Sequence, residues 1–196
     1  MATDVGAAAA LAAAVRKAEE RLSGRQVPLM GVMAAFVFAA QMVNFPIPGG
    51  TSGHLLGAVL LSVMLGPPVA AVVMFCVLLV QALLFQDGGI TALGANFINM
   101  ALVGVLAGGA VAKVNGLLRT DWMRSAAVFL SCWLSVVAGA VLYALELWLS
   151  GKAPLGPVVV TMASVHALIG LGEGALTIAA MAVLRSARLW QAEARG

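Results

Sequence analysis

Charged side chains are scarce in this 196-residue chain: Asp, Glu, Lys and Arg make up 10% of it, whereas hydrophobic residues make up 62%. The mean hydropathy is +1.04. Soluble domains are only about half apolar, so this composition excludes a soluble globular protein. The apolar runs are about twenty residues long and continuous, which favours membrane helices over the roughly ten-residue alternating strands of a barrel. We therefore expect an all-α, polytopic membrane helix bundle without sheet structure.

Several signatures of catalysis and of processing are missing. The chain has only two cysteines, and both Cys76 and Cys132 lie inside apolar runs, so we expect them to be small buried hydrophobic residues. There is no Walker phosphate loop, no His-Glu-x-x-His motif and no clear Ser–His or Cys–His pair, so we expect neither ATP hydrolysis nor another enzymatic activity. No basic leader with an apolar stretch and cleavage site opens the chain, so we expect no signal peptide.

Breaks at charges, prolines and glycines divide the chain into six hydrophobic segments that follow a short leader. We expect one integral-membrane domain over 1–196, in which 1–26 form a partial leading helix and a basic connection, 27–185 form the core, and 186–196 form a cytoplasmic tail. The expected segments lie at about 27–45, 54–65, 67–85, 91–112, 125–149 and 157–184. The segment 54–65 is too short to cross about 30 Å of hydrocarbon, so we expect it to be tilted or buried among its neighbours.

The basic residues occupy alternate connections between these segments. Of the 11 Lys and Arg residues, Lys152 is the only one in the connections that contain 44–53, 86–90 and 150–156. The positive-inside rule therefore predicts a multi-pass protein of the cell membrane, with the basic connections in the cytoplasm and the loop of His54 outside. This distribution also explains the net charge of +3, so we expect no nucleic-acid partner.

The stretch Asn-Phe-Pro-Ile-Pro-Gly-Gly-Thr-Ser-Gly-His-Leu-Leu-Gly, residues 44–57, is polar and broken by proline and glycine. It places His54 at the expected outer start of a helix, where a neutral imidazole nitrogen can bind a borderline metal such as nickel or cobalt. Thr51 and Ser52 precede this histidine and are candidates to support it. The alternative is a histidine that is merely hydrogen-bonded to a neighbouring carbonyl group.

Polar groups at membrane depth are costly, so the few that are present are functional candidates. His166 and Glu173 are seven residues apart and share one face of the last segment. Glu173 either binds a cation or a partner, or is held by hydrogen bonds between helices. Gly170, Gly172 and Gly174 permit close helix approach, which favours the structural alternative. We expect His166 to support a site rather than to act as a ligand.

Two amides, Gln81 and Asn96, flank the loop after the segment 67–85. Each can join helices or hydrogen-bond the second nitrogen of a metal ligand. Asp87, between them, is expected to be a solvated loop residue. On the segment 27–45, Ala35 and Ala39 belong to a patch of small residues that allows another helix, in this chain or in a partner, to pack closely.

Three stretches together, 44–57, 81–96 and 166–174, resemble the CbiM/NikM family, the metal-binding S components of energy-coupling-factor transporters for cobalt and nickel. The resemblance covers about residues 10–185. It implies a helical bundle that captures Ni²⁺ or Co²⁺, as transported substrate, from outside. It also implies docking on a membrane coupling subunit driven by two cytoplasmic ATPases, with room for a small accessory membrane protein. Ala35 and Ala39 are the candidate face for the coupling subunit.

The resemblance implies a square-planar site of four nitrogens: the N-terminal amine, the backbone and ring nitrogens of a histidine at position two, and a loop histidine that His54 matches. This chain begins Met1-Ala2-Thr3 and has no histidine before His54. We therefore expect the native chain to extend further N-terminally. A vitamin-binding S component and a non-catalytic membrane scaffold remain alternatives, and the same nitrogen donors serve cobalt and nickel alike.

Overall fold

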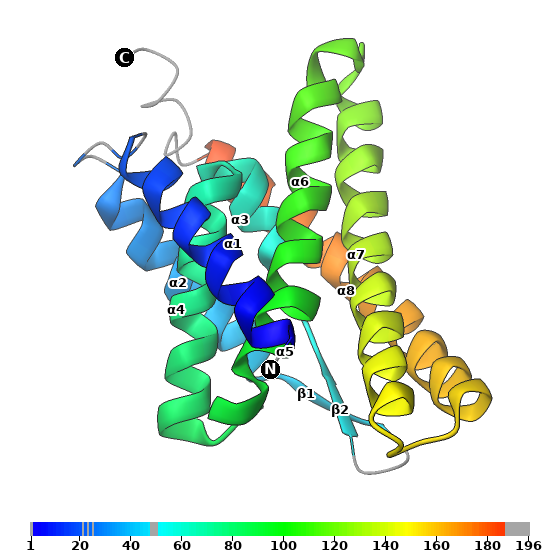
Figure 1. Cartoon of the computed structure of the whole chain (residues 1–196). Helices are drawn as coiled ribbons and strands as arrows, with labels where there is room; N and C mark the ends of the chain where they lie inside the picture. The colour runs from blue at the N-terminus through cyan, green and yellow to red at the C-terminus, as the bar shows by residue number, and fades with distance from the viewer. Residues whose placement is uncertain (1, 21, 23, 25, 48–50, 187–196) are drawn as a thin grey trace.

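The computed structural model describes residues 2–20, 22, 24, 26–47 and 51–186 (Figure 1). Arg21, Arg25 and most of the expected tail, 187–196, lie outside this description. Helices dominate, and short π and 3-10 turns (81–85, 90–92, 97–102 and 115–117) extend three of them. The α-helices are α1 (Ala2–Glu19), α2 (Val27–Gln41), α3 (Ala58–Leu65), α4 (Pro67–Val80), α5 (Leu93–Asn96), α6 (Val103–Val114), α7 (Asp121–Leu149) and α8 (Leu155–Ser186).

Four helical runs in the described residues are long and apolar enough to cross a membrane: Pro67–Phe85, Ile90–Leu117, Asp121–Leu149 and Leu155–Ser186. The other two core helices are shorter, because α2 has 15 residues and α3 has 8. At about 1.5 Å per residue they span about 22 and 12 Å, less than the hydrocarbon thickness. The chain is thus a helical membrane protein, in which four of the six expected segments have the length of a span.

A two-stranded antiparallel hairpin is present, although no sheet was expected from the sequence. Strand β1 (Asn44–Ile47) pairs with β2 (Thr51–His54), with Asn44 opposite His54. The fixed φ of Pro46 suits an edge strand, and a strand of four residues is too short to show a clear alternation of polar and apolar residues. The expectation that His54 starts a helix is therefore wrong: it ends β2, and α3 begins at Ala58.

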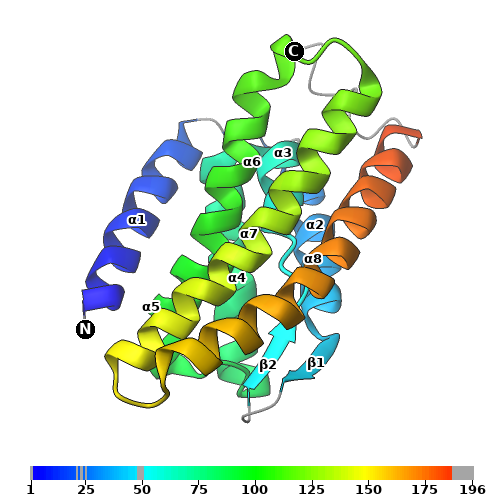
Figure 2. The same cartoon turned by 90° about the vertical axis from the view of Figure 1, so that its right-hand side faces the viewer.

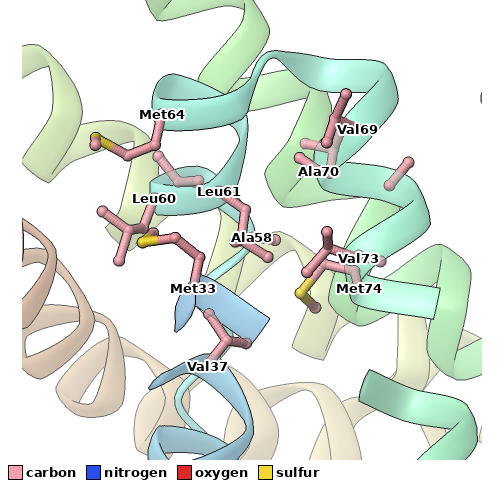
Figure 3. Close-up of a cluster of buried hydrophobic side chains, with 14 of the residues drawn as sticks. Met33, Val37, Ala58, Leu60, Leu61, Met64, Val69, Ala70, Val73 and Met74 are labelled. Atoms are coloured by element: carbon pink, nitrogen blue, oxygen red, sulfur yellow. The ribbon is translucent and has the colours of Figure 1, made fainter. Parts of the chain in front are cut away.

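The centre of the bundle is α3. Ala58, Val59, Leu60 and Leu61 are each at most 1% exposed. Figure 3 shows α3 side chains packed against Met33 and Val37 of α2 on one side and against Val69, Ala70, Val73 and Met74 of α4 on the other. The short segment is thus buried among its neighbours, which is one of the two arrangements expected from its length.

Two glycines let α6 approach α3 closely. A Cβ added at Gly104 would lie 2.6 Å from the Cβ of Ala58. A Cβ added at Gly108 would lie 2.7 Å from the Cβ of Ser62 and 3.0 Å from the carbonyl oxygen of Val59. Small residues at such contacts allow helices in a membrane to pack backbone to backbone.

The connections gather at two ends of the bundle (Figures 1 and 2). The hairpin end carries β1 and β2, residues 86–89, the α7–α8 connection and the start of α1. The basic end carries the α3–α4 turn, the α6–α7 connection and the last turn of α8. We call the second end basic because the helix ends and connections that gather there carry most of the described basic residues. These residues are Arg16, Lys17, Lys113, Arg119, Arg124 and Arg185. This alternation is the one expected from the sequence.

The two cysteines differ in their surroundings. Cys132 of α7 is buried, as expected, whereas Cys76 of α4 is exposed on the surface of the bundle, contrary to expectation. Because α4 belongs to a membrane-length run, an exposed thiol there faces the apolar surroundings at little cost, since a free cysteine behaves as a small hydrophobic residue.

Candidate metal site

A cavity of about 280 Å³ lies at the hairpin end of the bundle, between the end of α2, strand β2, the loop 86–89, and helices α7 and α8. It brings together five of the side chains predicted from the sequence: Ser52, His54, Gln81, Asn96 and His166. Its other polar lining residues are Gln41, Asp87, Asn99 and Tyr143. Segments far apart in the sequence therefore build one polar chamber inside an apolar bundle.

His54 is held by its Nδ1 atom, which lies 2.9 Å from the backbone carbonyl oxygen of Gln41. A carbonyl oxygen only accepts, so Nδ1 carries the proton and donates it, and Nε2 keeps the lone pair of the neutral ring. The Ser52 hydroxyl lies 3.1 Å from Nε2 and donates to it. The hydrogen bond from His54 to a carbonyl group, which was the alternative to a metal ligand, is thus present. It uses only Nδ1 and leaves Nε2 as the nitrogen that a metal can use.

His166 has the same arrangement. Its Nδ1 lies 2.8 Å from the carbonyl oxygen of Met162, one turn earlier on α8, so its Nε2 also keeps the lone pair. The absence of a side chain at Gly53 lets the hairpin approach this ring, because a Cβ there would lie 3.2 Å from His166 Nε2. Two imidazoles, from β2 and from α8, therefore line one cavity.

Three residues that line this chamber carry a buried amide atom without a hydrogen-bond partner in the described part of the protein. These atoms are Gln41 Oε1, Gln81 Nε2 and Asn99 Oδ1. The opposite ends of two of them are fixed: Gln41 Nε2 donates to the Leu56 carbonyl at 2.7 Å, and Asn99 Nδ2 donates to Glu146 Oε2 at 2.9 Å. Unpaired buried amides are costly, so they are suited to hold water or a hydrated ion.

Gln41, Asn99 and Glu146 are not among the residues predicted from the sequence. The signal that identifies Gln41 and Asn99 is the one that identifies Gln81 and Asn96, namely an amide inside an apolar run. Asp87 corrects an expectation, because it is not simply a solvated loop residue. It lines the cavity, and its Oδ1 lies 4.0 Å from His54 Nε2.

Glu173 does not line the cavity. It is 2% exposed, and its carboxylate accepts hydrogen bonds from the backbone N–H groups of Leu56, at 2.8 Å, and Gly57, at 2.7 Å. These groups precede the first turn of α3, where a negative charge is favourable. The sequence left two alternatives for Glu173, namely binding of a cation or partner, or being held by hydrogen bonds. The observed geometry agrees with the second. Glu173 fixes the segment that joins His54 to α3.

The other predicted residues are not part of the described lining of the chamber. Thr51 pairs through its backbone with Ile47, and its side chain lies outside the described structure. Ala35 and Ala39 are exposed on α2 and do not line the cavity. No group of three or more His, Cys, Asp and Glu side chains in the described residues is arranged to hold one metal ion. The groups of the described lining that can donate a lone pair to a metal ion include two imidazoles, one carboxylate and several amides.

The sequence of this chain matches a family described as the cobalt uptake substrate-specific transmembrane region, CbiM, over residues 1–189. The chain belongs to the CbiM family. The matched range includes His54, His166 and every other lining residue of the chamber.

Individual relatives agree with this assignment. A Haloquadratum walsbyi protein named for metal transport is 39% identical over 188 residues, which cover 94% of this chain and 84% of the relative. An Archaeoglobus fulgidus protein named as a fused nickel transport protein is 42% identical, and the match covers 86% of this chain but only 57% of that relative. The cobalt transport protein CbiM of Thermosediminibacter oceani is 36% identical, with 80% of this chain and 66% of the relative covered.

The fold also matches a solved structure. A crystal structure described as a truncated transition metal transporter superimposes with a TM-score of 0.86 and 30% sequence identity. The match covers 94% of this chain and 92% of that one. The helical bundle is therefore the fold of a known transporter.

Proposed function

We propose that this CbiM-family chain is the substrate-capture subunit of a Co²⁺ or Ni²⁺ importer, and that the metal enters at the chamber of His54. The observation that carries the proposal is the fixed imidazole: Nδ1 is held by the Gln41 carbonyl, so Nε2 offers its lone pair. Neutral imidazole nitrogen suits nickel and cobalt. The printed names of relatives, one for nickel and one for cobalt, support the same two metals.

The chamber favours a metal ion over a vitamin. Its volume of about 280 Å³ lies at the lower limit of pockets for organic ligands, which hold roughly 300–1,000 Å³. Tyr143 is the only Phe, Tyr or Trp residue among the described lining residues, whereas the polar lining consists mostly of imidazole, amide and carboxylate groups. Such groups can replace waters in the hydration shell of an ion one by one.

Orientation and energy supply belong to the same proposal. The hairpin end faces outward and the basic end faces the cytoplasm, in accordance with the positive-inside rule. Two cytoplasmic ATPases drive release through a membrane coupling subunit, which docks on the exposed face of α2 at Ala35 and Ala39. A small accessory membrane protein completes the assembly. The resemblance to energy-coupling-factor transporters supports these partners.

The experiment that tests the function is an uptake assay with the assembled transporter. The chain is expressed with its coupling subunit and ATPases in a host without other nickel or cobalt importers, and accumulation of the two radioactive metals is compared for the native chain, His54→Ala and the control Lys152→Ala. We expect His54→Ala to abolish uptake at unchanged membrane abundance and the control to retain it. Full uptake by His54→Ala at normal abundance would refute metal capture at this residue and leave the scaffold alternative.

A further inference from the structure

A second cavity, of about 180 Å³, lies at the basic end of the bundle between α6, α7 and α8, far along the helices from the chamber of His54. Arg124 in the first turn of α7 and Arg185 in the last turn of α8 both line it. Asn115 and Ser125 add polar atoms, whereas the deeper lining, such as Val128 and Met181, is apolar and buried. Metal capture at the hairpin end makes no use of this cavity.

Both charged side chains that line this cavity carry guanidinium groups, and no Asp or Glu is among the described residues that line it. The Arg124 group is fixed in place, because its Nε donates to the Leu118 carbonyl at 3.2 Å. Its Nη1 meets Asp121 at 3.3 Å, but the Asp121 side chain is 87% exposed, and such surface pairs contribute little. Guanidinium groups only donate hydrogen bonds, so the charged side chains of this cavity offer no ligand to a metal ion.

A phosphate group fits these donors. Guanidinium groups bind phosphate oxygens through paired N–H donors, and two of them from different helices can hold one phosphate from two sides. The apolar floor suits an acyl chain rather than a free anion. Trp122, beside Arg124 in sequence, is 71% exposed in the first turn of α7, which is typical of the headgroup level of a membrane. Basic pockets between membrane helices on the cytoplasmic side are suited to anionic headgroups.

We propose that the cavity of Arg124 and Arg185 binds the phosphate headgroup of an anionic phospholipid. The site joins the start of α7 to the end of α8 at the basic end, so a bound lipid holds together the two longest helices where they meet the interface. This inference does not depend on the identity of the transported substrate.

The test is native mass spectrometry of the full chain, purified in detergent and incubated with phosphatidylglycerol or with phosphatidylcholine. The variant Arg124→Gln/Arg185→Gln removes both guanidinium groups, and the matched control Lys113→Gln/Arg119→Gln removes two charges from the same end without altering the lining. We expect the pocket variant to bind phosphatidylglycerol at least about fivefold more weakly and the control to change by less than about twofold. Equal losses in the two variants would reduce the effect to surface charge and overturn the proposal.

Two further measurements distinguish loss of binding from misfolding, and a lipid headgroup from free phosphate. Arg124→Lys/Arg185→Lys keeps the charge and the size of the side chains but loses the paired donors, so it should fold and still bind the lipid more weakly than the native chain. Native-like binding by this variant would contradict recognition by guanidinium. Inorganic phosphate at equal concentration should displace little phosphatidylglycerol. If it competes with equal affinity, the site is a phosphate site and not a lipid site, which would overturn the proposal as stated.

Discussion

The Nδ1 atom of His54 lies 2.9 Å from the backbone carbonyl oxygen of Gln41, and this contact ties the end of β2 to the end of α2. The acceptor is a backbone atom, so the ring is oriented by the fold rather than by another mobile side chain. The tautomer with its lone pair on Nε2 is therefore present before any metal arrives. Pre-organised donors of this kind reduce the cost of ordering the site on binding.

The Ser52 hydroxyl donates to the same Nε2 atom at 3.1 Å, so in the proposed site it would compete with a metal for the lone pair. We expect Ser52→Ala to tighten Ni²⁺ or Co²⁺ binding by about two- to tenfold, since a net hydrogen bond worth about 0.5–1.5 kcal/mol no longer has to be broken. Isothermal titration of the purified variant measures this change. Weaker binding would mean that the hydroxyl serves the bound metal instead.

Glu173 should matter for stability more than for the chemistry of metal binding. Replacement by Gln leaves one of the buried N–H groups of Leu56 and Gly57 facing an amide NH₂ group instead of an oxygen. We expect Glu173→Gln to lower the free energy of unfolding by about 1–3 kcal/mol. Denaturant titration in detergent micelles provides the measurement, with the exposed Glu19→Gln as control. An unchanged unfolding midpoint for Glu173→Gln would show that its two hydrogen bonds are dispensable.

The close contact between α6 and α3 predicts that a larger residue at Gly108 lowers the stability of the fold. The Cβ of Gly108→Ala would meet Ser62 at 2.7 Å and the Val59 carbonyl at 3.0 Å, so α6 must move away from the central helix. We expect a loss of about 1–3 kcal/mol of stability. Gly31→Ala on α2 is the matched control, because a Cβ at that helical position meets nothing within 4 Å. The control should be neutral or slightly stabilising, since Ala favours a helix over Gly. Equal stabilisation of the two variants would contradict the tight packing.

The proposed docking of a coupling subunit on α2 predicts that transport and metal binding can be separated. Ala35→Phe/Ala39→Phe makes the exposed face of α2 bulky without touching the chamber. Uptake by the assembled transporter should fall at least about tenfold while metal binding by the isolated chain stays unchanged, because small residues let helices approach closely. Ala175→Phe/Ala179→Phe places the same pair of rings on the exposed face of α8 and serves as control. A similar loss of uptake in both variants would argue against a docking role for α2.

Much of the bundle could be predicted from the sequence. The hydrophobic effect removes long apolar runs from water, and burying backbone N–H and C=O groups without hydrogen bonds is costly, so such runs form helices. The membrane-length runs beginning at Pro67, Ile90, Asp121 and Leu155 lie close to expected segments. The alternation of basic connections likewise predicts which ends gather together. Gly66, with a φ of 81°, forms the turn between α3 and α4 ahead of two prolines, as the breaker pattern predicts.

The hairpin and several lining residues of the chamber could not be predicted from the sequence in this way. Four-residue strands that contain Pro46 and Gly53 carry too little periodicity to distinguish a strand from a loop. The role of Gln41 depends on its backbone carbonyl, an atom that every residue has, so no side-chain pattern could assign it to His54. Asp87 resembles a solvated loop residue until the fold brings its loop beside β2.

Metal capture by His54 is tested by a calorimetric titration of Ni²⁺ and Co²⁺ into purified, tag-free protein and into His54→Ala. We expect saturable binding of one ion per native chain and a loss of at least about tenfold in affinity for the variant, with an unchanged circular dichroism spectrum. Equal affinity of the native chain and the variant for both metals would contradict capture by His54.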